Sequence, residues 1–146
     1  MLIYLDNCCY NRPYDNQAFV SIHIESQAKI FIQEQIKNGK IELATSYVLY
    51  YENSQNPFEI RKNTIEDFAS NYETIYISKE KHNDVINLSK TIENSGIKHK
   101  DACHIACAIL ANCDYFITTD YRLLKYKTDL IKIINPTNFV KELEFF

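Results

Sequence analysis

The sequence predicts an α/β fold in which a parallel sheet of about five strands is covered by helices on both faces. Two observations support this prediction. Short apolar segments alternate along the chain with longer segments in which apolar residues recur at helical spacing. The stretches between successive apolar segments are long enough to form the right-handed crossovers that join parallel strands. Because ligands bind at the carboxyl ends of the strands in such sheets, functional residues are expected at that edge.

Five apolar segments are the expected strands. They occupy residues 2–5, 41–44, 74–78, 115–117 and 131–134. The third segment, TIYIS, is rich in β-branched and aromatic residues, which favour strands. Pro136 is expected to end the fifth, because proline lacks the backbone N–H that a sheet requires.

The segments between and after the strands are expected to be helical. They cover residues 17–38, 47–52, 58–70, 79–95, 101–112 and 137–146, with a short helix around Leu123 and Leu124. Thr45 or Ser46 is the expected N-cap of the second of these helices. Gly39 and Gly96 are the expected stops after two others, because glycine readily adopts the left-handed conformation that ends many helices.

Length and composition bound the class of protein. At 146 residues, with 46% hydrophobic and 24% charged residues, the chain is expected to form one globular domain, 1–146. Its net charge of −3 does not indicate a broad basic surface, although an enzyme can meet nucleic acid at one local site. The N-terminal apolar run is stopped by Asp6 and is too short for a signal peptide or a membrane span, so a cytoplasmic location without membrane contact is expected.

Four carboxylates are expected to meet at the carboxyl edge of the sheet. Asp6 directly follows the first strand, and Asp120 follows the fourth strand after two threonines. Glu52 lies early in the helix after the second strand, and Asp101 starts the helix that leads to the fourth strand. Segments that are distant in the sequence therefore bring their acids to one rim.

Each acid taken alone has a simpler structural explanation. Asp101 and Asp120 are alternatively the N-caps of the helices that follow them. Glu52 is alternatively a solvated helix residue, which is the usual environment of glutamate, and Asp6 a residue in a turn.

The four acids taken together favour a metal site. Two unit charges about 4 Å apart repel by about 1 kcal/mol in water and by about 4 kcal/mol at an effective dielectric constant of 20. With no Lys or Arg expected among the acids, a bound cation is the expected source of compensation. Oxygen ligands suit Mg²⁺ or Mn²⁺, and either ion can activate water and stabilise charge on a phosphodiester.

The segments LDNCCYNRP, SYVLYYE, KDACHIACA and DYFITTD together resemble a PIN-domain nuclease of the kind found in VapC-type toxins. The resemblance spans nearly the whole chain, and it rests on the order and spacing of motifs that are each short. It implies a three-layer α/β/α fold, metal-dependent endoribonuclease activity and a homodimer. The family's acids match Asp6, Glu52, Asp101 and Asp120, which are thereby implied to be catalytic and metal-binding. Many relatives have Ser or Thr after the first acid, where this chain has Asn7, whose amide can still bind water or phosphate.

Several neighbours of the acids are candidates for contacts with substrate. Thr118 and Thr119 precede Asp120 and can orient the metal shell or a phosphate, or simply end a strand. Arg12 and Lys100 stand beside edge segments and can meet an RNA backbone, with a solvated surface role as the alternative.

The helix after Asp101 also carries histidine and cysteine. His104 lies one turn inside this helix, and a capping or surface role is expected for it, with a position facing the site as the alternative. Cys103 and Cys107 are four residues apart, but a zinc site requires four ligands and no partner pair is evident. These cysteines are therefore expected to be buried thiols.

The expected function is that of a Mg²⁺- or Mn²⁺-dependent endoribonuclease, the toxin of a type II toxin–antitoxin pair, with RNA as substrate and a protein antitoxin as partner. Helices 17–38 and 58–70 are the expected contact surface of the homodimer. The alternative is a non-catalytic RNA-binding module on the same fold. A phosphatase of the haloacid-dehalogenase type is disfavoured, because it needs a second Asp where this chain has Cys8.

Overall fold

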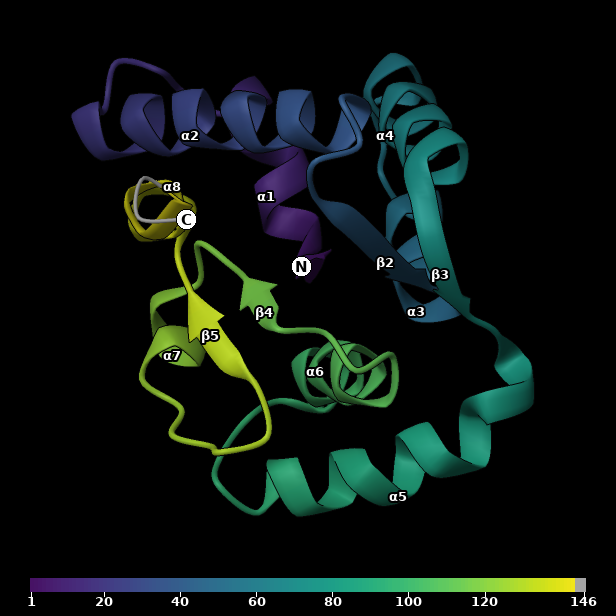
Figure 1. The fold of residues 1–146 in the computed structure, drawn as a ribbon. Helices are drawn as coiled ribbons and strands as arrows, with labels where there is room; N and C mark the ends of the chain where they lie inside the picture. The colour runs from purple at the N-terminus through teal and green to yellow at the C-terminus, as the bar shows by residue number, and fades with distance from the viewer. Residues whose placement is uncertain (144–146) are drawn as a thin grey trace.

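The computed structural model describes residues 1–143, which form a five-stranded sheet between two layers of helices (Figure 1). The strands lie in the order β3-β2-β1-β4-β5, and every neighbouring pair is parallel. The strands are β1 (Leu2–Leu5), β2 (Glu42–Ser46), β3 (Glu73–Ile77), β4 (Tyr115–Ile117) and β5 (Lys132–Ile134). The predicted three-layer α/β/α fold with a parallel sheet is therefore confirmed.

The two central strands are the most apolar ones. Every residue of β1 and of β4 is buried, because helices cover both faces of the sheet at these positions. The edge strands β3 and β5 keep exposed residues, as expected where a sheet meets solvent. The core of the protein thus surrounds β1 and β4, whose carboxyl ends are fixed most firmly.

The helices follow the strands in nearly the predicted places. Their bounds are α1 (Asn7–Asn11), α2 (Val20–Lys37), α3 (Tyr47–Ser54), α4 (Glu59–Tyr72), α5 (His82–Glu93), α6 (His99–Leu110), α7 (Tyr121–Leu124) and α8 (Pro136–Leu143), with 3-10 turns η1 (Arg12–Tyr14) and η2 (Lys79–Lys81). The last three residues of the helix predicted at 137–146 lie outside the described residues. Within residues 1–143, no helix has the length and apolar character needed to cross a membrane.

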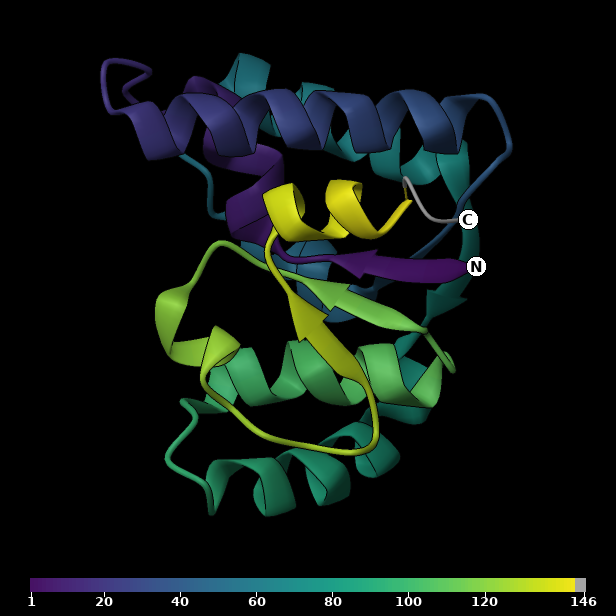
Figure 2. The same ribbon diagram turned by 60° about the vertical axis from the view of Figure 1, so that its left-hand side comes forward.

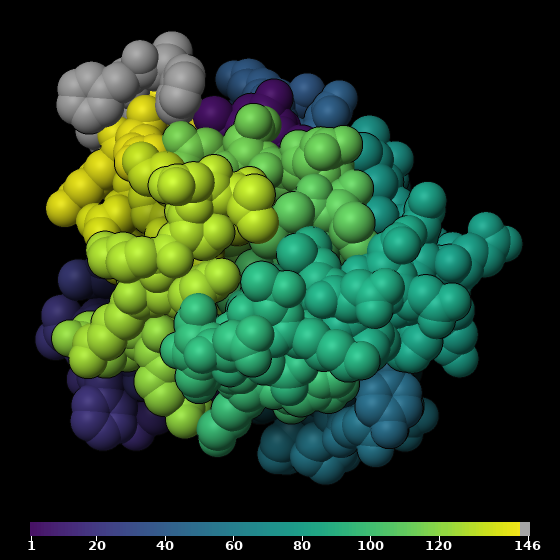
Figure 3. Space-filling view, turned by 90° about the horizontal axis from the view of Figure 1, so that it is seen from below, coloured from purple at the N-terminus to yellow at the C-terminus, as the bar shows by residue number. Residues whose placement is uncertain are grey.

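The helices form one layer on each face of the sheet. Helices α1, α2 and α8 lie on one face, and α5 and α6 lie on the other, as Figures 1 and 2 show from two sides. Helix α6 packs between the sheet and α5, and all seven of its residues from Ala102 to Ala108 are buried. Seen from below, α5 and the chain between α7 and β5 form much of the outer surface (Figure 3).

Two differences between the predicted and observed helices lie at the carboxyl edge of the sheet. Helix α1, directly after β1, was not predicted, because five residues are too few to show a helical period. Helix α6 starts at His99, after the extended residue Lys98, so Asp101 lies inside its first turn. The prediction that the helix starts at Asp101 is therefore wrong by two residues, and the alternative explanation of Asp101 as its N-cap is excluded.

Candidate metal centre

The candidate site lies where the chain connections from the sheet diverge. Strand β1 leads to β2 on one side, whereas its neighbour β4 leads to β5 on the other. In parallel α/β sheets such a divergence leaves a crevice at the carboxyl ends of the two strands. Asp6 follows β1 and Thr118 follows β4, and the backbone N–H of Asp6 donates to the carbonyl of Ile117 at 2.9 Å. The sheet itself therefore holds these two segments together.

Asp6 is almost fully buried, with 5% of its surface exposed, and three donors fix its carboxylate. The backbone N–H of Asn7 donates to Oδ1 at 2.8 Å, so Asp6 is also the N-cap of α1. The Thr118 hydroxyl donates to Oδ2 at 2.9 Å, and the Cys8 thiol donates to the same oxygen at 3.3 Å. The orientation of this carboxylate is thus set before any ligand arrives.

Glu52 reaches the same place from the helix that follows β2. Ser46 caps this helix by accepting from the backbone N–H of Leu49 at 3.1 Å, as one of the two predicted caps. Glu52 Oε2 lies 3.0 Å from Lys100 Nζ and 3.4 Å from His104 Nε2. Burial alone would raise the pKa of Glu52, but the hydrogen bonds and charges of His104 and Lys100 outweigh it and lower the pKa to about 2.

His104 faces the site, and the prediction that it caps or lies on the surface is wrong. Its side chain is fully buried, and its Nδ1 lies 2.7 Å from the hydroxyl of Tyr4. That hydroxyl lies 2.7 Å from Ser46 Oγ, so the helix cap and the histidine share one hydrogen-bond chain. Burial alone would lower the pKa of His104, but the hydrogen bond to Glu52 and the charges of Asp6, Glu52 and Asp101 outweigh it and raise the pKa.

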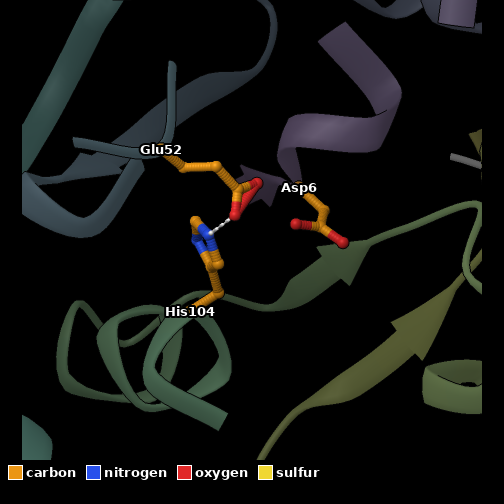
Figure 4. A group of neighbouring side chains, drawn as sticks. All are labelled: Asp6, Glu52 and His104. Carbon is orange, nitrogen blue, oxygen red and sulfur yellow. Dashed lines mark hydrogen bonds and ion pairs between the residues drawn. The ribbon is translucent and has the colours of Figure 1, made fainter. Parts of the chain in front are cut away.

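Asp6, Glu52 and His104 form a three-residue group whose ligand atoms lie within 4.8 Å of one another (Figure 4). Two carboxylates and an imidazole are a donor set that divalent metals accept, and Mn²⁺ tolerates the nitrogen better than Mg²⁺ does. Tyr4 engages His104 through Nδ1 and so leaves Nε2 directed at the group, which is how a histidine ligand is usually oriented. The residues present therefore fit a divalent cation.

The other two predicted acids border this group without joining the three atoms. Asp101 is half-buried, and burial, followed by the charges of Asp6 and Asp120, raises its pKa. Asp120 caps α7 by accepting from the backbone N–H of Arg122 at 2.9 Å, and its Oδ1 also lies 3.6 Å from Arg122 Nε. Asp120 therefore has the capping role that was the alternative explanation for it, and its charge still acts on Asp101.

Of the residues predicted to lie beside the acids, some contact them and others do not. Thr118 links two of the acids, because its hydroxyl donates to Asp6 and accepts from the backbone N–H of Asp120 at 3.0 Å. The backbone N–H of Thr119 donates to Cys8 Sγ at 3.4 Å. Arg12 instead forms ion pairs with Asp15 at 3.2 Å and Glu25 at 3.4 Å, so its charge already has partners at the start of α2.

Two hollows flank Glu52 and Lys100. We call the first the polar groove; its volume is about 340 Å³, and amide side chains dominate its wall. It is lined by Asn7, Asn11, Glu52, Gln55, Asn56, Pro57, Phe58, Arg61 and Lys100. We call the second the apolar pocket; its volume is about 420 Å³, and it is lined by Tyr47, Val48, Tyr51, Lys79, His82, Ile86, His99, Lys100 and Cys103. Lys100 belongs to both.

Known proteins give one informative comparison. No family model matches the sequence, and no curated protein matches it either. Among solved structures, the chain is similar to the crystal structure of VapBC2 from Rickettsia felis bound to a DNA fragment from its promoter, with a TM-score of 0.55. The fold is PIN-like. The match covers 92% of this chain and 98% of that chain at 17% identity. At this identity the similarity concerns the fold alone.

Proposed function

We propose that this chain is a metal-dependent endoribonuclease that hydrolyses RNA phosphodiester bonds. The observation that carries the proposal is the group of Asp6, Glu52 and His104, with ligand atoms within 4.8 Å of one another at the switch point of a PIN-like fold. Asp101 and Asp120 add negative charge around this group. Together these five side chains offer a divalent cation four carboxylates and one imidazole.

Asp6, Glu52 and His104 would hold the cation, and Asp101 and Asp120 would hold its water shell. When bound, the cation supplies an activated water and stabilisation of the charge that develops on the phosphate. Asp101 is suited to take a proton from the attacking water, because its raised pKa makes its carboxylate a better base than an ordinary aspartate. Thr118 keeps Asp6 and the start of α7 in register, which preserves the spacing of the acids.

The polar groove supplies contacts for the RNA backbone. Most protein contacts to nucleic-acid phosphate and sugar come from Arg, Lys and amide side chains, and all three kinds line this groove. Lys100 is the best placed of them, because its side chain is 64% exposed and can turn from Glu52 to a phosphate. A local cationic contact of this kind is compatible with a net charge of −3.

A role as the toxin of a type II toxin–antitoxin pair follows from the resemblance of the sequence motifs. The similar solved structure is that of VapBC2 bound to promoter DNA, which is consistent with a protein antitoxin as partner. A homodimer and a single domain over residues 1–146 are part of the same proposal. Induced expression of the wild type should arrest bacterial growth, and expression of Asp6→Asn should not. Growth arrest by the wild type and by Asp6→Asn alike would contradict a toxic nuclease activity.

The competing function is a non-catalytic RNA-binding module. It is favoured by the ion pairs that Lys100 and Arg122 make with Glu52 and Asp120, because these cations compensate two acids without a metal. Such a module would bind single-stranded RNA and leave it intact.

A cleavage assay separates the two functions. Purified protein is incubated with single-stranded RNA in Mg²⁺, in Mn²⁺ and in EDTA, alongside Asp6→Asn and the exposed-loop control Asp129→Asn. If the chain is a nuclease, the wild type and the control cleave RNA when metal is present and not in EDTA. Asp6→Asn does not cleave RNA under either condition. Equal cleavage by all three preparations would identify a contaminant, and binding without cleavage would identify the module.

A further inference from the structure

The apolar pocket is built from pairs of side chains that lie one helical turn apart. Helices α3, α5 and α6 each contribute two residues spaced by four, so each pair projects from one face of its helix. These pairs are Tyr47 and Tyr51, His82 and Ile86, and His99 and Cys103. The wall of the pocket is therefore formed by side chains from three regular helices.

Two tyrosine rings from α3, those of Tyr47 and Tyr51, line the pocket. Tyr47 is held in place, because its hydroxyl lies 2.7 Å from His82 Nδ1 and the two rings meet edge-on at 5.8 Å. Tyr51 remains 68% exposed, and it directly precedes Glu52 on α3. An exposed ring in the lining of the pocket offers a flat apolar face on which a planar ligand can stack.

Lys79 and Lys100 give the rim of the pocket positive charge. His82 and His99 line the rim as well, and none of its lining residues in the described chain is acidic. Lys100 Nζ is 3.0 Å from Glu52 Oε2, so the rim continues directly into the acid group. A ligand that is apolar and flat at one end and anionic at the other matches this arrangement, as a nucleotide does.

Hydrogen-bond donors outnumber acceptors in the pocket. Lysine offers donors only, and the lining includes no carboxylate or amide side chain that could accept from an exocyclic amino group. The pocket volume of about 420 Å³ is within the usual range for small-ligand sites. Uracil, which presents two carbonyl oxygens and no exocyclic amino group, therefore suits the pocket better than cytosine, whose amino group would lack an acceptor.

We propose that the apolar pocket binds the base of a nucleotide next to the scissile phosphate of single-stranded RNA, and that it prefers uracil over cytosine. The inference rests on the proposed ribonuclease function and adds a base-specific subsite to it. Tyr51 stacks on the base, Lys79 donates to its carbonyl oxygen, and Lys100 accompanies the adjoining phosphate.

Binding to short RNAs tests the subsite without requiring cleavage. In an Asp6→Asn background with Mn²⁺, fluorescence anisotropy compares short oligouridylate, oligocytidylate and an abasic ribose-phosphate oligomer of equal length. Uracil and cytosine are similar in size and differ in the keto and amino groups at the edge. We expect oligouridylate to bind about tenfold more tightly than oligocytidylate, which is about 1.4 kcal/mol.

Two variants assign the roles. Tyr51→Ala should weaken binding of both base-containing RNAs by about tenfold and leave the abasic oligomer unchanged, whereas Tyr51→Phe should bind normally. Lys79→Met should remove the preference for uracil over cytosine and keep the binding of cytosine. Tyr72→Ala and Lys90→Met, which lie on the surface outside the pocket, serve as matched controls.

The outcomes separate the subsite from the nuclease. Normal metal-dependent cleavage with no effect of Tyr51→Ala on binding would overturn the subsite and leave the ribonuclease standing. Base-dependent binding without cleavage by the wild type would support the subsite and overturn the ribonuclease. Sedimentation that shows a wild-type dimer converted to monomers by Tyr51→Ala would assign the pocket to a second copy of the chain and overturn the proposal.

Discussion

Lys100 Nζ lies 3.0 Å from Glu52 Oε2, so one of the four predicted acids is paired with a cation of the protein itself. Lys100 occupies the second position of α6 and Glu52 the sixth position of α3, and these two helices meet beside β1 and β2. The sequence-based expectation that no Lys or Arg joins the acids is therefore wrong. The pair makes Lys100 a competitor for any metal that uses Glu52.

The first prediction concerns this competition. Lys100→Met should tighten Mn²⁺ binding by up to about fivefold, because an exposed ion pair contributes at most about 1 kcal/mol. The same change should weaken RNA binding, because a cation near the phosphate is lost. Isothermal titration with Mn²⁺ and anisotropy with RNA measure the two effects, with the exposed Lys98→Met as control. Weaker Mn²⁺ binding in Lys100→Met would show that the lysine supports the metal instead.

The second prediction concerns the choice of metal. His104→Gln replaces an imidazole nitrogen with an amide oxygen, and oxygen ligands do not favour Mn²⁺ over Mg²⁺ as nitrogen does. The ratio of Mn²⁺ affinity to Mg²⁺ affinity should fall by about tenfold, a change of about 1.4 kcal/mol. The exposed His23→Gln should keep the wild-type ratio. An unchanged ratio in His104→Gln would remove His104 from the ligand set.

The third prediction concerns Asp101 in the metal-free protein. Burial and the charges of Asp6 and Asp120 raise its pKa, so its ionised form destabilises the fold. Asp101→Asn should stabilise the metal-free protein by about 1 kcal/mol at pH 7. The gain should vanish below the ordinary pKa of an aspartate, where Asp101 is protonated in both the folded and the unfolded state.

Thermal melts in EDTA at pH 7 and pH 3 measure this effect, with Asp129→Asn as the matched exposed control. With metal present, Asp101→Asn should gain less stability than the wild type, because the affinity for the ion falls. A variant that melts like the wild type in both conditions would leave Asp101 outside the acid group.

The fourth prediction concerns a buried cation far from the candidate centre. Lys29 on α2 is 6% exposed and lies over the ring of Tyr10, with its Nζ 5.7 Å from the ring centroid. Burial, with a smaller effect of Lys37, lowers its pKa from 10.5 to about 8. Between these two values the unfolded chain binds more protons than the folded protein, so stability contributed at this site rises with pH.

The stability of the wild type relative to Lys29→Met should therefore rise by about 1 kcal/mol between pH 7 and pH 9. Urea unfolding at a series of pH values measures the difference, in which the titration of the cysteines common to both chains cancels. The exposed Lys40→Met should run parallel to the wild type. Parallel curves for Lys29→Met as well would show that the lysine is solvated in the folded protein.

The sequence was sufficient for the fold because its strands are distinct. β1 and β4 are short apolar runs bounded by polar residues, and their register follows once the crossovers are placed. The convergence of Asp6 and Asp120 was predictable for the same reason, since each directly follows a central strand or its two threonines. Each strand can be recognised in the sequence, so the residue at its carboxyl end can be located as well.

The environment of His104 and Lys100 was not predictable in this way. Helix α6 is buried on all sides from Ala102 to Ala108, so helical periodicity does not distinguish the face that meets the acids. Lys100 reaches Glu52 through a long side chain whose direction depends on the packing of α3 against α6. Both contacts join helices about 50 residues apart in the sequence, and a local sequence pattern does not show which distant side chains meet.

Metal binding and RNA cleavage, measured in the same protein, test the proposed ribonuclease centre most directly. Mn²⁺ binding is followed by the loss of the free-ion electron paramagnetic resonance signal, and cleavage of single-stranded RNA is followed under single-turnover conditions at the same Mn²⁺ concentrations. If the bound ion is the catalytic one, both curves share one midpoint, and Glu52→Gln moves both midpoints to higher Mn²⁺ by the same factor. Cleavage that persists unchanged in Glu52→Gln while Mn²⁺ binding weakens would contradict a ribonuclease centred on Asp6, Glu52 and His104.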